Sequence, residues 1–153
     1  MRRALEWARR GAEKGEVPVG ALLVQDFGLP GQRVLAAAHN RTENRPDPTA
    51  HAERLVLERA ARRLGRWRLN DCSLIVTLEP CAMCAGAAVW ARLGTIVYGA
   101  PDPKAGACGS VLSVAENPKL NHRIPVRGGV LEPECGAILR DFFRTKRKAR
   151  PLS

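Results

Sequence analysis

Pro48-Thr49-Ala50-His51-Ala52-Glu53 and Glu79-Pro80-Cys81-Ala82-Met83-Cys84 are the two stretches that decide the fold of this chain. Together they offer an imidazole, two thiols and a carboxylate that stands apart from them. Zinc in proteins prefers four nitrogen or sulfur ligands, so His51, Cys81 and Cys84 would leave one position open to water. An open position is typical of catalytic zinc, and we predict such a site here.

The Cys-x-x-Cys pair has other readings that must be weighed. Taken alone, this pair is more often a redox pair or half of a structural zinc site. The preceding Glu79-Pro80 and the upstream His51 favour catalytic zinc. A structural site needs a fourth protein ligand, and the candidates, none of which stands at paired spacing with another, are Cys72, Cys108, Cys135, His39 and His122. Structural zinc therefore remains the alternative.

Two helices are predicted to carry these ligands. The first has Asp47 as its N-cap and Pro48 at its first position, and it runs to about residue 64. The second covers about residues 80–91. All three ligands then lie near helix N-termini, where the positive end of the helix dipole favours the thiolate that a metal needs. We expect the two helix N-termini to converge on one metal ion.

Glu53 is the predicted general acid and base of the site. On an ideal helix it lies roughly 200° round from His51, so it reaches the metal only if the helix start is distorted or its side chain folds back. A carboxylate that does reach the metal can take a proton from water held there and deliver it to a substrate.

Composition indicates one globular domain over residues 1–153. The chain is 45% hydrophobic, and no apolar run reaches transmembrane length. Five cysteines without a framework spacing indicate a reducing compartment, so we expect a cytoplasmic location. Three of them, Cys72, Cys108 and Cys135, are expected to be small buried apolar residues.

The chain is also strongly basic. Its net charge of +10 and its pI near 10.3 indicate a polyanionic partner, of which nucleic acid is the commonest. One arginine run is expected to be a solvated face: Arg59, Arg62, Arg63, Arg66 and Arg68. The tail 146–153 is basic and expected to be frayed, and it follows the last predicted helix.

The remaining sequence alternates helical and strand patterns. Helices are predicted over 2–14, 111–115 and 132–147, and strands over 17–24, 34–38, 72–78, 95–98 and 126–131, the last as a sheet edge. The succession of strand, helix and strand over 72–98 implies a right-handed parallel crossover. The fold class is α/β, with a sheet of about five strands between layers of helices.

Four motifs together resemble the bacterial tRNA-specific adenosine deaminases of the cytidine deaminase superfamily. They are Val17-Pro18-Val19-Gly20-Ala21, Asp47-Pro48-Thr49-Ala50-His51-Ala52-Glu53, Thr77-Leu78-Glu79-Pro80-Cys81-Ala82-Met83-Cys84-Ala85-Gly86-Ala87 and Asn121-His122-Arg123. The resemblance implies a three-layer α/β/α fold with a mixed sheet and a homodimer with one Zn²⁺ per subunit. It also implies hydrolysis of adenosine to inosine at the wobble position of a tRNA anticodon stem-loop.

The resemblance assigns roles to individual residues. His51, Cys81 and Cys84 would hold the zinc, Glu53 would carry the proton, and Asn40 would grip the flipped base, unless Asn40 is an ordinary turn asparagine.

The other expected substrate contacts lie in two later segments. Loop position makes Asp102 a candidate acceptor for a 2′-hydroxyl and Lys104 a candidate phosphate contact. Phe143 and Arg144 lie in the segment that resembles the family's C-terminal helix, where an exposed phenylalanine could stack on an unpaired base.

Two other functions remain open from the residues alone. One is a deaminase of a free base or nucleoside, of the guanine or cytosine type, with the same zinc chemistry. The other is a zinc module that binds nucleic acid without catalysis. The large positive charge favours RNA over a small neutral base, because a neutral base gains nothing from the field.

Overall fold

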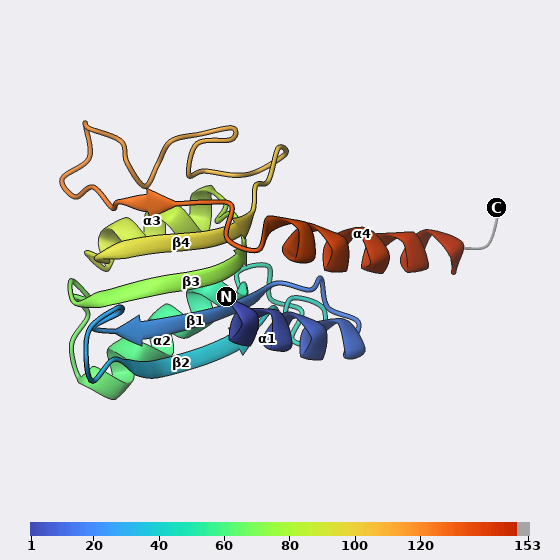
Figure 1. The fold of residues 1–153 in the computed structure, drawn as a ribbon, viewed down its shortest axis with the longest axis horizontal. Coiled ribbons are helices and arrows are strands. Elements are labelled where there is room, and N and C mark those ends of the chain that lie inside the picture. Colours follow the sequence, from blue (N-terminus) through green and yellow to red (C-terminus); the bar gives the residue numbers. More distant parts are fainter. Residues whose placement is uncertain (150–153) are drawn as a thin grey trace.

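The structure is a computed structural model and describes residues 1–149. Within these residues the centre of the fold is one five-stranded sheet of order β2-β1-β3-β4-β5 (Figure 1). Its strands are β1 (Gly20–Gln25), β2 (Arg33–His39), β3 (Cys72–Leu78), β4 (Thr95–Ala100) and β5 (Val126–Arg127). β1 is antiparallel to both β2 and β3, whereas β3, β4 and β5 run parallel. The sheet is therefore mixed, as expected.

Helices cover both faces of this sheet. They are α1 (Arg2–Glu13), α2 (Ala52–Leu64), α3 (Ala82–Trp90) and α4 (Glu132–Lys148). In Figure 1, α2 and α3 lie behind the sheet and α1 lies in front of it. Alternate residues of β1 point to opposite layers, because Leu23 packs with Val56 of α2 whereas Leu22 packs with Ala4 of α1. The predicted three-layer α/β/α architecture of the cytidine-deaminase type is confirmed.

The close contact between α1 and β1 depends on a glycine. A Cβ atom added at Gly20 would lie 1.9 Å from the carbonyl oxygen of Ala4 and 2.5 Å from the nitrogen of Ala8. The helix backbone therefore rests directly on the strand backbone, which only glycine permits. This contact places the N-terminal helix over the sheet.

Several predicted boundaries are wrong, and the structure gives the reasons. β1 begins at residue 20 rather than 17, because the Val19 amide turns back to the Val17 carbonyl at 2.8 Å. The predicted strand 126–131 contains only two paired residues, although it does form the sheet edge, because Gly129 takes a positive φ of 83° and turns the chain. No helix forms over 111–115, where the chain folds back on Gly106 and Ala107 through backbone hydrogen bonds.

The C-terminal helix extends further than predicted. It ends at Lys148, one residue beyond the predicted end at 147, so residues 146–148 of the tail that was expected to be frayed are helical, and the last part of that tail, 150–153, lies outside the described residues. In Figure 1, α4 projects beyond the end of the sheet. No helix of the described residues is both long enough and apolar enough to span a membrane.

Candidate active site

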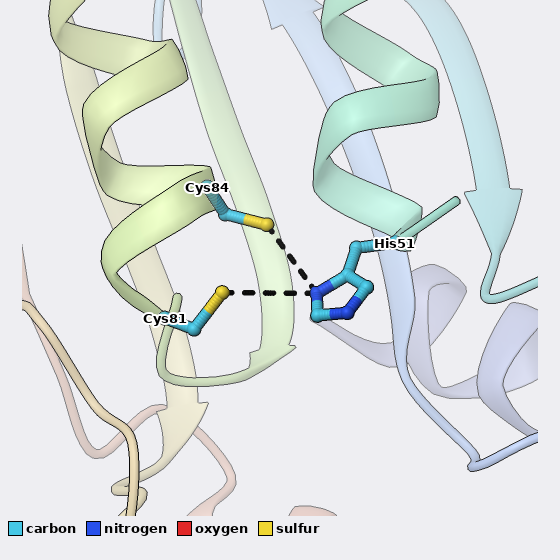
Figure 2. A group of neighbouring side chains, drawn as sticks. All are labelled: His51, Cys81 and Cys84. Atoms are coloured by element: carbon cyan, nitrogen blue, oxygen red, sulfur yellow. Dashed lines mark hydrogen bonds between the residues drawn. The ribbon is translucent and has the colours of Figure 1, made fainter. Parts of the chain in front are cut away.

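His51, Cys81 and Cys84 meet between the N-terminal ends of α2 and α3, as predicted (Figure 2). His51 is the N-cap of α2 and Cys81 is the N-cap of α3, whereas Cys84 lies in the first turn of α3. The His51 Nδ1 atom is 3.7 Å from the Cys81 sulfur and 3.5 Å from the Cys84 sulfur. The three atoms lie within 4.8 Å of one another and form a group that could hold a metal ion.

These separations fit a tetrahedral metal bound by nitrogen and sulfur. With ordinary zinc bond lengths, a nitrogen and a sulfur on one tetrahedral ion lie about 3.6 Å apart. Both nitrogen–sulfur distances in the group lie close to this value. The donor set is also soft, which excludes magnesium and calcium as preferred ions.

The hydrogen bond between the two thiols of the ligand group favours a thiolate at Cys81 alone. A hydrogen bond from Cys84 outweighs burial and lowers the pKa of the Cys81 thiol to about 4, while it raises the pKa of Cys84 itself. The hydrogen bond to Cys81 also raises the pKa of His51, against the effect of burial. One thiolate therefore forms readily at the meeting point of the two helices.

The N-terminus of α2 begins later than the sequence predicted. Asp47 does not cap a helix, because its carboxylate accepts hydrogen bonds at 2.8 Å from both the amide and the hydroxyl of Thr49. The helix starts instead at Ala52, whose amide donates at 2.9 Å to Oδ1 of Asn40. His51 thus has an extended backbone, with φ of −72° and ψ of 147°. The predicted cap at Asp47 and the predicted first position at Pro48 are both wrong.

The late start of α2 removes the separation expected between the side chains of His51 and Glu53. Because His51 precedes the helix, the helical offset that separated its side chain from that of Glu53 does not apply. Glu53 is buried with 3% of its surface exposed, and it lines the same cavity as His51 and Cys81. Its Oε2 atom is buried without a hydrogen-bond partner in the described part of the chain. Burial raises the pKa of Glu53 to about 7, so its carboxyl group exchanges protons near neutral pH.

Two cavities adjoin at the site. The smaller, of about 230 Å³, is lined by His51 and Cys81 of the ligand group and also by Asn40, Glu53 and Asp102. The larger, of about 940 Å³, lies between the segment after β4 and α4. Three residues line both cavities: Val17, Leu78 and Asp102. A reactive pocket thus opens beside a cleft large enough for neighbouring parts of a long substrate.

The structure brings most of the predicted substrate residues to these cavities. Asp102, Lys104 and Phe143 line the larger cleft, and the Phe143 side chain is exposed. Arg144 does not line either cavity, since its guanidinium pairs with Asp141 at 2.9 Å on the exposed side of α4. Arg140, which the sequence did not single out, lines the cleft in its place. Its position three residues before Phe143 on the same helix face is the signal that was available.

Glu79 is a second residue for which the sequence suggested no role. It is buried directly before the Pro80-Cys81 step, and it accepts hydrogen bonds from the segment 102–110. Burial opposes its ionisation, but the hydrogen bonds from Ser110, Asp102 and Cys108 outweigh burial and lower the pKa of Glu79. Cys72, Cys108 and Cys135 are buried, as predicted.

Comparison with known proteins agrees with this geometry. The sequence profile of the MafB19-like deaminases matches residues 1–147. A Bacillus subtilis protein named tRNA-specific adenosine deaminase is 46% identical over 150 residues, which are 98% of this chain and 90% of that protein. A Haemophilus influenzae protein of the same name is 41% identical over 152 residues, covering 99% of this chain and 86% of that protein.

Solved structures of deaminases share the fold of this chain. One, from studies of A-to-I editing by tRNA:A34 deaminases at the wobble position of transfer RNA, superposes with a TM-score of 0.84 at 45% identity over 91% of this chain and 97% of that one. A guanine deaminase from Nitrosomonas europaea superposes with a TM-score of 0.75 at 25% identity over 92% of this chain and 81% of that one.

The three-layer fold and the His-Cys-Cys group beside a buried glutamate define a deaminase of the cytidine-deaminase type. Relatives that share more than two fifths of their residues with it along nearly their whole length narrow the class further. The chain belongs to the family of tRNA-specific adenosine deaminases.

Proposed function

We propose that this protein deaminates adenosine to inosine at the wobble position of a tRNA anticodon, with one zinc ion per subunit. The observation that carries the proposal is the small cavity, which is lined by His51 and Cys81 of the metal-ligand triad and by Glu53, whose buried Oε2 atom has no hydrogen-bond partner in the described residues. The names of the full-length relatives supply the substrate.

His51, Cys81 and Cys84 would hold the zinc. When bound there, zinc would act as a Lewis acid that makes water a sufficiently strong nucleophile near neutral pH. The chain contributes the ligand atoms at the required separations and the thiolate at Cys81.

Glu53 is proposed to move the protons of the reaction. Oxygen from water replaces the exocyclic amine of the adenine ring, and the amine leaves as ammonia. Glu53 accepts a proton from the attacking water, passes it to a ring nitrogen, and delivers the next proton to the leaving amine. A carboxyl group with a pKa near neutrality suits both directions of transfer, and Oε2 has no competing partner in the described chain.

Asn40 is proposed to orient the base. Its Oδ1 atom is committed to the Ala52 amide, so its Nδ2 group is the part that can donate to the substrate. The residue lines the small cavity together with Glu53. One side chain would thus fix both the start of α2 and the ring of the substrate.

The larger cleft is proposed to receive nucleotides beside the target. Lys104 would contact a phosphate, Asp102 a 2′-hydroxyl, and Phe143 would stack on an unpaired base. Arg144 would contact the RNA backbone from outside the cleft, beyond its exposed pair with Asp141. The net charge of +10 supports a polyanionic substrate.

The test is incubation of the protein with an anticodon stem-loop that carries adenosine at the wobble position. Free adenosine, cytidine and guanine are assayed in parallel. Inosine in the stem-loop, without turnover of the free compounds, is expected. Turnover of guanine or cytidine alone would establish the alternative, a free-base or nucleoside deaminase, whose fold the Nitrosomonas europaea guanine deaminase shares.

The variant Glu53→Ala separates an enzyme from a zinc module without catalysis. We expect deamination to fall by about 10²-fold to 10⁴-fold, as for the loss of a general acid and base, while bound zinc and thermal stability persist. Equal activity in the variant would refute the role of Glu53.

We also propose that the protein is a homodimer. Apolar side chains are exposed on α3 and on the segment between β4 and β5, with 74% of Trp90 exposed. On the segment between β4 and β5 the exposed apolar side chains are those of Val111, Leu112 and Leu120. Exposed apolar groups of this kind are typical of protein interfaces. Light scattering coupled to gel filtration tests this, and a monomer at micromolar concentration would contradict it.

Residues 1–153 are proposed to act as a single deaminase domain in the cytoplasm. A tRNA substrate and five free cysteines both suit that compartment.

A further inference from the structure

The carboxylate of Glu79 is surrounded by the backbone of the segment 102–110. Its Oε2 atom accepts from the Asp102 amide at 2.9 Å and from the hydroxyl of Ser110. Its Oε1 atom accepts from the amides of Cys108 and Ser110, each at 3.0 Å. Within residues 1–149, Glu79 forms no ion pair with a lysine or an arginine. The carboxylate is therefore held by the loop, and the loop is held by the carboxylate.

Packing around this carboxylate is equally close. A Cβ atom added at Gly106 would lie 2.4 Å from Cδ of Glu79, so the loop backbone passes directly over the side chain. Gly106 also forms a β-bridge with Cys81, and the Ala107 amide donates at 2.8 Å to the carbonyl of Pro80. The loop is thus hydrogen-bonded to Glu79, Pro80 and Cys81, the residues that lead from β3 into the N-terminal end of α3.

The part of the loop that Glu79 fixes is the wall of both cavities. Asp102 lines the small cavity and the large cleft, and Lys104 lines the cleft. The Asp102 carboxylate in turn accepts from the amides of Lys104 at 2.9 Å and Ala105 at 3.2 Å. The position of Asp102 therefore sets the position of the residues that follow it.

We propose that Glu79 is a positioning residue for RNA, which sets the substrate-facing wall of the site through its hydrogen bonds to Asp102, Cys108 and Ser110. This inference rests on the proposed function, because the wall matters only if an extended substrate occupies the cleft. Glu79 also borders the small cavity, but both of its carboxylate oxygens accept hydrogen bonds from the loop, so it acts on the substrate through Asp102.

The substitution Glu79→Gln has a specific expected effect. An amide nitrogen at the Oε1 position would face two backbone donors, whereas at the Oε2 position it would face only the amide of Asp102, because the Ser110 hydroxyl can rotate to accept. The second orientation is the less costly one. The loop is therefore released at Asp102, the residue that lines both cavities.

The matched control is Asp71→Asn. Asp71 directly precedes β3 and Glu79 directly follows it, so the two carboxylates lie at opposite ends of one strand. Asp71 also accepts several hydrogen bonds, from Arg66 and Gln25, but it lines neither cavity. This variant tests whether the loss of any hydrogen-bonded carboxylate next to β3 is enough to raise KM and to speed exchange in 101–111.

The experiment measures kcat and KM with the anticodon stem-loop, zinc content, and hydrogen exchange of a peptide covering 101–111. For Glu79→Gln we expect KM to rise about tenfold, from the loss of one buried hydrogen bond, with kcat and zinc content nearly unchanged and exchange in 101–111 faster. For Asp71→Asn we expect KM and this exchange as in the parent. If Glu79→Gln fails to fold, Ser110→Ala removes one donor and should show the same pattern more weakly.

The outcomes separate the two proposals. If the parent protein does not deaminate the stem-loop, the proposed function fails, and hydrogen exchange still reports whether Glu79 holds the loop. Unchanged exchange and unchanged KM in Glu79→Gln overturn the inference. A rise in KM accompanied by a fall in kcat and in zinc content also overturns it, because that pattern indicates a purely structural role.

Discussion

Asn40 shows how one side chain serves both structure and chemistry. Its oxygen caps α2 at the Ala52 amide, and its nitrogen is left for the proposed substrate. Replacing Asn40 with alanine should lower the free energy of unfolding by about 1 kcal/mol, the usual effect of losing an N-cap. Asn40→Asp keeps an acceptor at the helix N-terminus, so stability should be retained while kcat/KM falls about 10-fold to 100-fold with the lost donor.

Urea unfolding and steady-state kinetics of the two Asn40 variants check this prediction. Parent-like activity in Asn40→Asp would mean that the residue acts as a helix cap alone.

Asp71 makes a pH-dependent contribution to stability. The hydrogen bonds from Arg66, at 2.6 and 2.7 Å, lower the pKa of Asp71 from 3.8 to about 2. A group with a depressed folded-state pKa stabilises the protein above its unfolded pKa, and this contribution is lost as the pH falls through the folded pKa. About a third of the Asp71 side chain is exposed, so screening leaves about 1 kcal/mol.

Thermal unfolding of the parent and of Asp71→Asn tests this contribution. The variant should unfold about 2 to 4 °C lower at neutral pH, and the difference should vanish between pH 4 and pH 2. A difference that stays constant down to pH 2 would assign the effect to packing instead of charge.

At the scale of elements, the contact between α1 and β1 leaves the least room for an added side-chain atom. Gly20→Ala would place a methyl group 1.9 Å from a backbone oxygen of α1, so helix and strand must separate. We expect a loss of at least about 2 to 3 kcal/mol. Gly86→Ala is the matched control, because a Cβ atom there meets nothing within 4 Å and α3 should gain about 0.5 to 1 kcal/mol. Chemical denaturation of both variants measures the contrast, and equal stabilities would contradict it.

Elements also show where sequence patterns succeed. The strand over 72–78 was predicted at its observed bounds because it is an apolar run enclosed on both faces. The triad followed from the spacing of Cys81 and Cys84, which puts both sulfurs on one side of a helix start.

The failures of prediction have a common physical origin. Asp47-Pro48 has the local signature of a helix start, but the cap comes from Asn40, the residue directly after β2, through a tertiary contact that local spacing does not encode. Glu79 was missed because its partners are backbone amides of a distant loop, which every residue type possesses. Patterns of side chains predicted the ligands, whereas the shape of the cavity wall depends on the folded backbone.

For the whole molecule, charge and shape together predict how RNA binding responds to salt. Arg147 and Lys148 lie in the last turn of α4, the helix that lines the cleft as far as Phe143, whereas Arg62 and Arg68 are exposed and do not line the cleft. Arg147→Gln with Lys148→Gln should reduce the slope of log affinity against log salt by about 1 to 2. The control pair Arg62→Gln with Arg68→Gln should leave the slope unchanged. Filter binding over a salt series measures both slopes, and equal slopes would place the RNA elsewhere.

The projection of α4 beyond the sheet has a further thermodynamic consequence. Within its residues 132–148 only Cys135, near the start, is fully buried, so the second half of the helix has little tertiary contact to oppose local opening. Its amide hydrogens should exchange far faster than those of α2. A substrate that orders this half on binding must offset the entropic cost of ordering it. This cost lowers the net affinity, so the edited product should dissociate faster.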